Sequence, residues 1–186
     1  MATPDAEPAE AYIMFSGPIH AEGADSIIKA AIDAVDAGAR TVVLCMASFG
    51  GNLDRGVSAG NMLAAMPAKL VTFNVGICAS AANVLFLAGE ERFASPEAVF
   101  RFHAGSVTLS EEELTGTQLD ERRAWLVADD EREQRIIQRR SSLTRAQARR
   151  IVEQSETFDA GQALAAGIVQ EVKDLKIPAG SLMISA

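Results

Sequence analysis

Short apolar runs alternate along the chain with segments whose apolar residues recur at helical spacing. The runs are typical of buried strands and occupy residues 12–15, 41–46, 70–75, 99–103 and 168–172. Between the first two runs, residues 27–35 carry apolar side chains on one face of a helix that Gly38 ends. Further helices are predicted over residues 53–66 and 80–88. Strands that alternate with helices of this length indicate an α/β fold with a mostly parallel sheet and flanking helices.

Residues 111–140 differ from the rest of the chain, because half of them are charged and no strand pattern occurs among them. Ser110 and Glu113 have the form of a capping box, which marks the start of a helix. Thirty helical residues would extend about 45 Å at about 1.5 Å each. That length exceeds what a domain of this size covers. We therefore expect a projecting helix over about residues 110–141 that packs on another subunit.

The two ends of the chain carry few structural signals. Residues 1–10 are polar and contain two prolines, so we expect a flexible tail. Residues 173–186 are expected to form a second tail, because Pro178 and Gly180 interrupt them. Residues 11–172 then form one domain, whose last part contains two short helices that start at capping boxes. These boxes are Thr144 with Gln147 and Asp159 with Gln162.

The composition is that of one globular domain. The chain has 186 residues, of which 48% are hydrophobic, and this excludes a wholly disordered chain. No apolar run approaches the roughly 20 residues that span a bilayer. The acidic start of the chain lacks the Lys and Arg of a secretory signal. We therefore expect a cytoplasmic protein without a membrane partner, in which Cys45 and Cys78 are core residues.

The charge balance is acidic, with 17 Lys and Arg against 25 Asp and Glu and a net charge of −8. This argues against nucleic acid as a partner, because phosphate binding requires clustered basic residues. Basic pairs occur at Arg122-Arg123, Arg139-Arg140 and Arg149-Arg150. They are interleaved with acidic residues, and Asp129 and Arg132 have the spacing of a helical ion pair. We interpret these charges as a solvated helix face.

Ser48-Phe49-Gly50-Gly51 directly follows the strand at residues 41–46 and precedes a helix. Two glycines at the carboxyl end of a parallel strand allow a sharp turn that presents backbone N–H groups to an anion or oxyanion. Ligands of such sheets bind at that edge. The alternative is a strand-to-helix turn without a ligand.

Ser80 follows a predicted strand and begins an apolar helix, with small residues on both sides. A strand-to-helix turn at this place can expose the hydroxyl group of a nucleophile. The surrounding residues do not match the Gly-x-Ser-x-Gly pattern of the α/β-hydrolases. The alternative interpretation is a serine that caps a buried helix.

His103 also lies at the end of a predicted strand, where a neutral imidazole could take a proton from a nearby hydroxyl group. The alternative is a structural histidine. We assign no role to His20, the other histidine. Two histidines at this spacing and two core cysteines do not form a zinc pattern, so we expect neither a metal nor a cofactor.

These features occur in a fixed order, with Ser80 29 residues after Gly51 and His103 23 residues after Ser80. In this combination the chain, from about residue 12 to residue 172, resembles the proteolytic subunit of the ATP-dependent Clp protease. Residues 48–51 resemble its Ser-Pro-Gly-Gly turn, and residues 76–89 (GICASAANVLFLAG) its serine segment. Phe102-His103 matches an Ile-His pair, and residues 159–172 resemble its last segment. Head-maturation proteases of phages are a related variant of this fold.

The resemblance implies a serine endopeptidase with the Clp protease and crotonase type of fold. Ser80 would be the nucleophile and His103 the general base, and the N–H groups of Gly51 and Ala81 would form the oxyanion hole. The substrate would be a peptide or an unfolded protein. The long charged helix would correspond to the handle that joins two heptameric rings, so we expect a homo-oligomeric ring. An ATPase unfoldase is an expected partner, although the short amino terminus leaves that partnership open.

The third member of the catalytic triad departs from the family. The aspartate of the family falls on Ser155, and Glu156 is adjacent. An orienting carboxylate holds the tautomer of the histidine, and its loss can reduce the rate about 10⁴-fold. Phe49 and Ala82 replace a proline and a glycine that contribute no functional side chain.

Three hypotheses follow from these observations. The first is a Clp-type serine endopeptidase. The second is a Clp-like scaffold that assembles but has weak or no catalytic activity, as the missing aspartate suggests. The third is a crotonase-like enzyme that binds an acyl-CoA with the same oxyanion hole, and it requires a glutamate base near the pocket and an adenine-binding surface.

Overall fold

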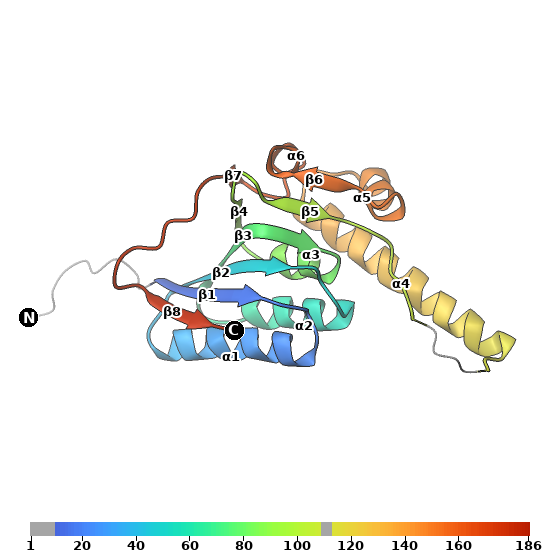
Figure 1. Ribbon diagram of the computed structural model, residues 1–186, viewed down its shortest axis with the longest axis horizontal. Coiled ribbons are helices and arrows are strands. Elements are labelled where there is room, and N and C mark those ends of the chain that lie inside the picture. The colour runs from blue at the N-terminus through green and yellow to red at the C-terminus, as the bar shows by residue number, and fades with distance from the viewer. Residues whose placement is uncertain (1–9, 109–112) are drawn as a thin grey trace, which may run out of the picture.

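The computed structural model describes residues 10–108 and 113–186, and these residues form a mixed α/β domain (Figure 1). The expected tail at residues 1–10 lies outside the described residues, apart from Glu10. The described strands are β1 (Glu10–Ser16), β2 (Thr41–Ser48), β3 (Lys69–Ala79), β4 (Glu91–Ala94), β5 (Val99–Arg101), β6 (Thr157–Asp159), β7 (Glu171–Val172) and β8 (Leu182–Ser185). The described helices are α1 (Ala21–Asp36), α2 (Leu53–Ala64), α3 (Ala81–Phe86), α4 (Gly116–Arg140), α5 (Arg145–Glu153) and α6 (Ala160–Ala165).

The strands form one sheet in the order β6-β5-β3-β2-β1-β8, and β4 joins it through β3 and β7. All of these pairs are parallel except β5 with β6, which confirms the mostly parallel α/β fold that the sequence predicts. Strand β2 is buried along most of its length because it is central and apolar. β4 and β6 were not predicted, since runs of four and three residues are too short to show a period.

The two faces of the sheet carry separate apolar clusters. The larger cluster packs against the helices and includes Ile27 of α1, Leu63 of α2 and Phe86 of α3. The smaller cluster, on the opposite face, includes Tyr12 and Phe73. Both cysteines are free and buried, as expected, and burial raises the pKa of the Cys45 thiol to about 12.

The carboxyl-terminal segment is not the tail that the sequence suggested. Leu175 and Ile177 pack against the smaller apolar cluster. The chain then turns at Pro178, whose carbonyl accepts a hydrogen bond from the Ser181 N–H group at 3.2 Å. Strand β8 follows and pairs in parallel with β1 at the edge of the sheet (Figure 1). The proline and the glycine therefore interrupt this segment only locally, and its apolar residues complete the sheet.

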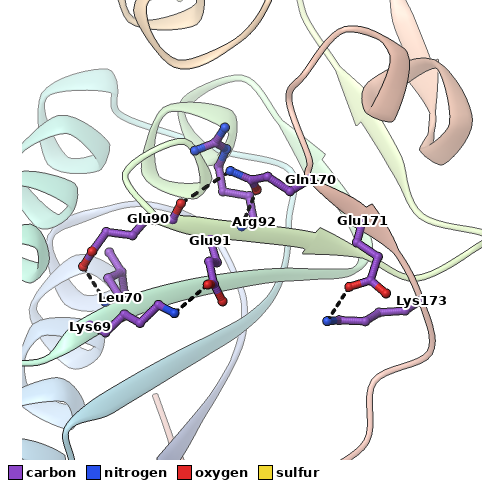
Figure 2. Close-up of polar contacts among 8 residues, drawn as sticks. All are labelled: Lys69, Leu70, Glu90, Glu91, Arg92, Gln170, Glu171 and Lys173. Atoms are coloured by element: carbon purple, nitrogen blue, oxygen red, sulfur yellow. Dashed lines mark hydrogen bonds and ion pairs between the residues drawn. The ribbon is translucent and has the colours of Figure 1, made fainter.

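Strand β4 is joined to the chain before β7 by the Gln170 side chain (Figure 2). Its Oε1 atom accepts a hydrogen bond from the Arg92 N–H group at 2.7 Å, and its Nε2 group donates one to the Glu90 carbonyl at 3.4 Å. Lys69, the first residue of the neighbouring strand β3, forms an ion pair at 2.6 Å with Glu91, the first residue of β4. These contacts hold the short strand in the sheet.

Helix α4 is the projecting helix, and its first half extends beyond the sheet (Figure 1). It begins after Thr115, which forms a capping box with Gln118. The start predicted at Ser110 lies outside the described residues. Trp125 and Val127 are exposed on α4, with exposed fractions of 71% and 50%. Within the described residues, no helix is long and apolar enough to cross a membrane.

Arg140, at the end of α4, departs from the solvated face that the sequence predicts for the basic pairs, whereas Arg139 is exposed as expected. Arg140 is half-buried, and its guanidinium group donates hydrogen bonds to the carbonyls of Leu87, Ala88 and Gly89 at 2.6–3.1 Å. These carbonyls directly follow α3 and lack a backbone donor within that helix. The arginine therefore joins the two helices instead of facing solvent.

Candidate active site

The glycine turn after β2 is organised by the buried Ser48 side chain. Its hydroxyl group donates a hydrogen bond to the Gly17 carbonyl at 2.6 Å and accepts one from the Gly50 N–H group at 3.1 Å. Gly50 has a φ of +90°, and a Cβ atom on it would lie 2.4 Å from the Ala79 carbonyl oxygen. Only glycine fits there, because the turn lies directly against the chain on either side of Ser80.

Ser80 lies between β3 and α3 with a φ of +54° and a ψ of −130°, a backbone conformation that residues other than glycine rarely adopt. Its N–H group donates a hydrogen bond to the Arg101 carbonyl at 3.0 Å, which brings the turn next to the end of β5. The side chain of Ser80 forms no capping hydrogen bond to α3. Ser80 is thus the N-cap residue of α3, as the alternative interpretation has it, but its hydroxyl group takes no part in the cap.

His103 follows β5 by two residues and lies close to the Ser80 turn. Its position is set by Phe102, which is buried, packs against Phe158 at a ring distance of 5.6 Å and donates a backbone hydrogen bond to the Glu156 carbonyl. The Nδ1 atom of His103 lies 2.8 Å from the Ala104 carbonyl oxygen. A carbonyl only accepts, so Nδ1 carries the proton and Nε2 remains an acceptor.

A cleft of about 350 Å³ brings the predicted residues together. Its lining includes Ser80, His103, Gly51, Phe49, Asn52, Leu53, Gly105, Ser106, Leu126, Asp129, Asp130 and Glu133. Ala81 is the first residue of α3, directly after Ser80, and its nitrogen would lie 3.0 Å from a Cβ atom on Gly50. No hydrogen bond joins Ser80 to His103 in the described residues.

Ser155 and Glu156 do not line this cleft. Ser155 is exposed after α5 and has a φ of +54°. The Glu156 carboxylate forms an ion pair with Arg150 at 2.9 Å, and only its backbone contacts the strand that leads to His103. In the described residues, the Ala104 carbonyl is the partner of Nδ1, in the place where an orienting carboxylate was expected.

Three carboxyl groups of α4 line the cleft, and sequence reasoning missed them. Asp130 accepts a hydrogen bond from the Gly105 N–H group at 2.6 Å, so it anchors the loop after His103. Glu133 is 4% exposed, and its Oε1 atom has no hydrogen-bond partner. Burial, and secondarily the Asp130 charge, raise the pKa of Glu133 to about 8.

The sequence contains a pattern that indicates the acidic side of the cleft formed by α4. Leu126, Asp130, Glu133 and Ile137 are spaced by four, three and four residues, which places them on one stripe of the helix. Acidic residues inside a stripe that begins and ends with buried or half-buried apolar residues are unlike a solvated face.

The predicted ion pair between Asp129 and Arg132 does not form in the described residues. Arg132 instead forms an ion pair with Asp54 of α2. Burial is the main cause of a raised pKa for Asp129, and the Asp54 charge adds to it. The carboxyl groups of the cleft are thus left without a lysine or arginine among the lining residues.

Comparison with known proteins identifies one family. Residues 8–176 match the family described as Clp protease. No curated protein matches the chain. The family match favours the peptidase hypothesis over an enzyme that acts on acyl-CoA. In the part of the chain that the structure describes, no group of three His, Cys, Asp or Glu side chains is arranged to hold a metal ion.

Proposed function

Because the chain belongs to the Clp protease family, we propose that it is a serine endopeptidase with Ser80 as its nucleophile. The observation that carries this proposal is the Ser80 turn. Its hydroxyl group is not used as a cap, its backbone is strained, and it shares a cleft with His103. Strain of this kind is typical of functional sites that the surrounding structure holds in place.

The proposed reaction follows the order of serine peptidases. His103 Nε2 takes the proton of the Ser80 hydroxyl while its oxygen bonds to the substrate carbonyl carbon. The same nitrogen then gives the proton to the leaving amine, and water hydrolyses the acyl-enzyme through the same two residues. The N–H groups of Gly51 and Ala81 would stabilise the oxyanion, each contributing about 3 kcal/mol.

The Ala104 carbonyl would take over one of the two roles of a triad aspartate. Its hydrogen bond with Nδ1 holds the tautomer that leaves Nε2 free to accept a proton. It carries no negative charge, so it stabilises the imidazolium less than a carboxylate would. We therefore expect activity below that of an enzyme with a complete triad. This lack of a carboxylate also favours a second candidate function, a Clp-like scaffold without efficient catalysis.

The proposal includes a homo-oligomeric ring, in the cytoplasm, that degrades peptides or unfolded proteins. The exposed Trp125 and Val127 of α4 support a subunit contact, because large apolar side chains grouped on a projecting helix gain free energy when a partner covers them. An ATPase unfoldase as a partner remains part of this proposal. Sedimentation velocity at micromolar concentration would test the ring, and a strict monomer would contradict it.

A fluorophosphonate probe tests the nucleophile. The probe is incubated with the assembled protein and with the Ser80→Ala, His103→Ala and Ser58→Ala variants, and the adduct is located by mass spectrometry. Ser58 is an exposed serine of α2 outside the cleft, so its variant is the matched control. We expect labelling at Ser80 that both cleft variants lose and the control retains. Peptide hydrolysis should fall about 10²-fold or more in Ser80→Ala, because the histidine already lacks a carboxylate and losses within a triad are not additive.

Two outcomes would contradict the proposed activity. An assembled ring that no probe labels would favour the scaffold function. Labelling that Ser80→Ala retains would place the nucleophile elsewhere.

A further inference from the structure

We propose that the cleft beside Ser80 selects peptides with a basic side chain, Lys or Arg, next to the bond that is cleaved, and that Glu133 receives the cationic end of that side chain. This inference rests on the proposed function, because it assigns a substrate class to the same site.

The main observation is the buried Glu133 carboxyl group without a partner. It is 96% buried on the wall of the cleft, and its Oε1 atom has no hydrogen-bond partner. A buried polar atom without a partner costs about 1–3 kcal/mol, and more if it is charged. Native proteins retain few such groups, and those that persist beside an open cleft are typical of a position that a ligand completes. When this carboxyl group is ionised, a donor is the missing partner.

The sign of the charge in the cleft favours a cationic donor. Asp129 and Asp130 lie one turn before Glu133 on the same wall, and no lysine or arginine lines the described cleft. Arg132 is paired with Asp54, and its charge offsets only part of the rise in the pKa of Asp129. The Nδ1–H group of His103 is already bonded to Ala104. A neutral donor would satisfy the hydrogen bond, but only a cation also gains from three carboxyl groups.

The other walls of the cleft fit the stem of a long basic side chain. Phe49, Leu53 and Leu126 line it, and Phe49 is 75% exposed at the turn beside Ser80. Lysine and arginine have apolar methylene stems and a polar end. Their stems would contact these apolar residues while their charged ends reach the carboxyl groups of α4. An acidic substrate side chain would meet like charges in the same place.

Occupation of the cleft should be coupled to the ionisation of Glu133. Its pKa of about 8 leaves it mostly protonated at neutral pH, and a bound ammonium group would favour loss of that proton. The groups that face it in the cleft are Asp129, Asp130 and His103. A preference for a basic substrate should therefore increase as the pH rises from about 7 to about 9, where lysine is still charged.

Two covalent probes that differ only in one amine group test the inference. They are peptidyl diphenyl phosphonates with a lysine or a norleucine side chain, and the measured quantity is the ratio of their rates of Ser80 labelling in the assembled protein. We expect the lysine probe to react at least about tenfold faster. Because both probes react with the same Ser80, the ratio taken at each pH removes the pH dependence that they share.

Variants on one helix connect this ratio to Glu133. Glu133→Gln should bring the ratio close to one, and Asp129→Asn should lower it partly. Glu131→Gln is the matched control, because Glu131 is exposed on α4, pairs with Arg135 at 3.6 Å and does not line the cleft. It should leave the ratio unchanged.

The outcomes separate this inference from the function on which it rests. Equal rates for the two probes, or a ratio that Glu133→Gln does not change, would overturn the basic specificity and leave Ser80 as the nucleophile. If neither probe labels Ser80 in the assembled protein, the proposed peptidase function itself fails, and the specificity fails with it.

Discussion

Among the described residues, Arg92 and Glu133 are the charged side chains that the domain buries most completely, with exposed fractions of 7% and 4%. The guanidinium group of Arg92 donates hydrogen bonds to the carbonyls of Ile168, Gly89, Arg140 and Gly167, at 2.7–3.3 Å. The carboxyl group of Glu133 has an oxygen that nothing in the described residues contacts by a hydrogen bond. Arg92 lies against the end of α4, whereas Glu133 belongs to the second half of that helix.

The hydrogen-bond partners of Arg92 and Glu133 indicate different reasons for burying the two charged groups. The carbonyls around Arg92 belong to the ends of α3 and α4 and to the chain before β7, so the arginine connects three segments that the sequence separates. Its N–H group also contacts Gln170 (Figure 2). Burial and the neighbouring Arg140 lower the pKa of Arg92 to about 10, and the group stays charged near neutral pH. Arg92 thus stabilises the fold, whereas Glu133 leaves a bonding position for a ligand.

The largest expected effect is the loss of the Arg92 network. Arg92→Met keeps the length of the side chain but removes its donors, and buried carbonyls are left without partners. Because each such group costs about 1–3 kcal/mol, we expect the free energy of unfolding to fall by about 4 kcal/mol. Urea denaturation measures this change. The exposed Arg139→Met variant, from the same end of α4, should change stability by less than about 0.5 kcal/mol.

Substitution of Glu133 should change the free energy of unfolding in the opposite direction near pH 8. Its pKa is raised in the folded protein from 4.5 to about 8, so between these values the folded state binds more protons than the unfolded state. The free energy of unfolding then decreases as the pH rises, by about 3 kcal/mol from about pH 5.5 to about pH 7.5. Glu133→Gln should remove this decrease and make the protein more stable than the wild type near pH 8.

Urea denaturation of both proteins across this pH range measures the difference. All other titratable groups are present in both proteins, so their contributions cancel in the comparison. Parallel pH profiles for the two proteins would show that Glu133 has a partner in solution, and the contrast with Arg92 would then disappear.

The smallest effect concerns Asp130, which shares the wall with Glu133 but has a partner. Asp130→Ala removes the hydrogen bond to the Gly105 N–H group and should loosen the loop after His103. We expect kcat for peptide hydrolysis to fall about tenfold, equivalent to about 1.4 kcal/mol. Asp130→Asn keeps an acceptor oxygen and should retain most of kcat. Equal losses of kcat in the two variants would mean that the negative charge of Asp130, and not its hydrogen bond to Gly105, supports catalysis.

Much of the fold was predictable, because it depends on local patterns. The apolar runs at β1, β2 and β3 and the capping boxes at Thr144 and Asp159 occur where the sequence predicts them. Ser80, His103 and Gly51 meet in one cleft because parallel strands bring their carboxyl ends to one edge of the sheet. Their catalytic roles remain predictions.

Partners of charged side chains within one helix turn were partly predictable, since Glu131 and Arg135 have i,i+4 spacing and form an ion pair at 3.6 Å, but partners far away in the chain were not. Arg140 was expected in solvent and binds the end of α3, and Arg132 was expected to pair with Asp129 and instead pairs with Asp54. Residues 173–186 were expected to be a tail and provide β8. In each case the partner lies far away in the chain, and helical or strand periodicity carries no information about such contacts.

The sequence by itself determined the order of the longer strands and helices, the turn that requires glycine at Gly50, and the residues that reach the edge of the sheet at the cleft, because periodicity and backbone sterics act over a few neighbouring residues. Only the tertiary structure decided which charges are buried and which of them have partners. Arg92 and the carbonyl of Ile168 are 76 residues apart, and Glu133 is open to the cleft only because α4 packs there. Burial and hydrogen bonding depend on the whole packed chain, and these two properties separate a structural charge from a functional one.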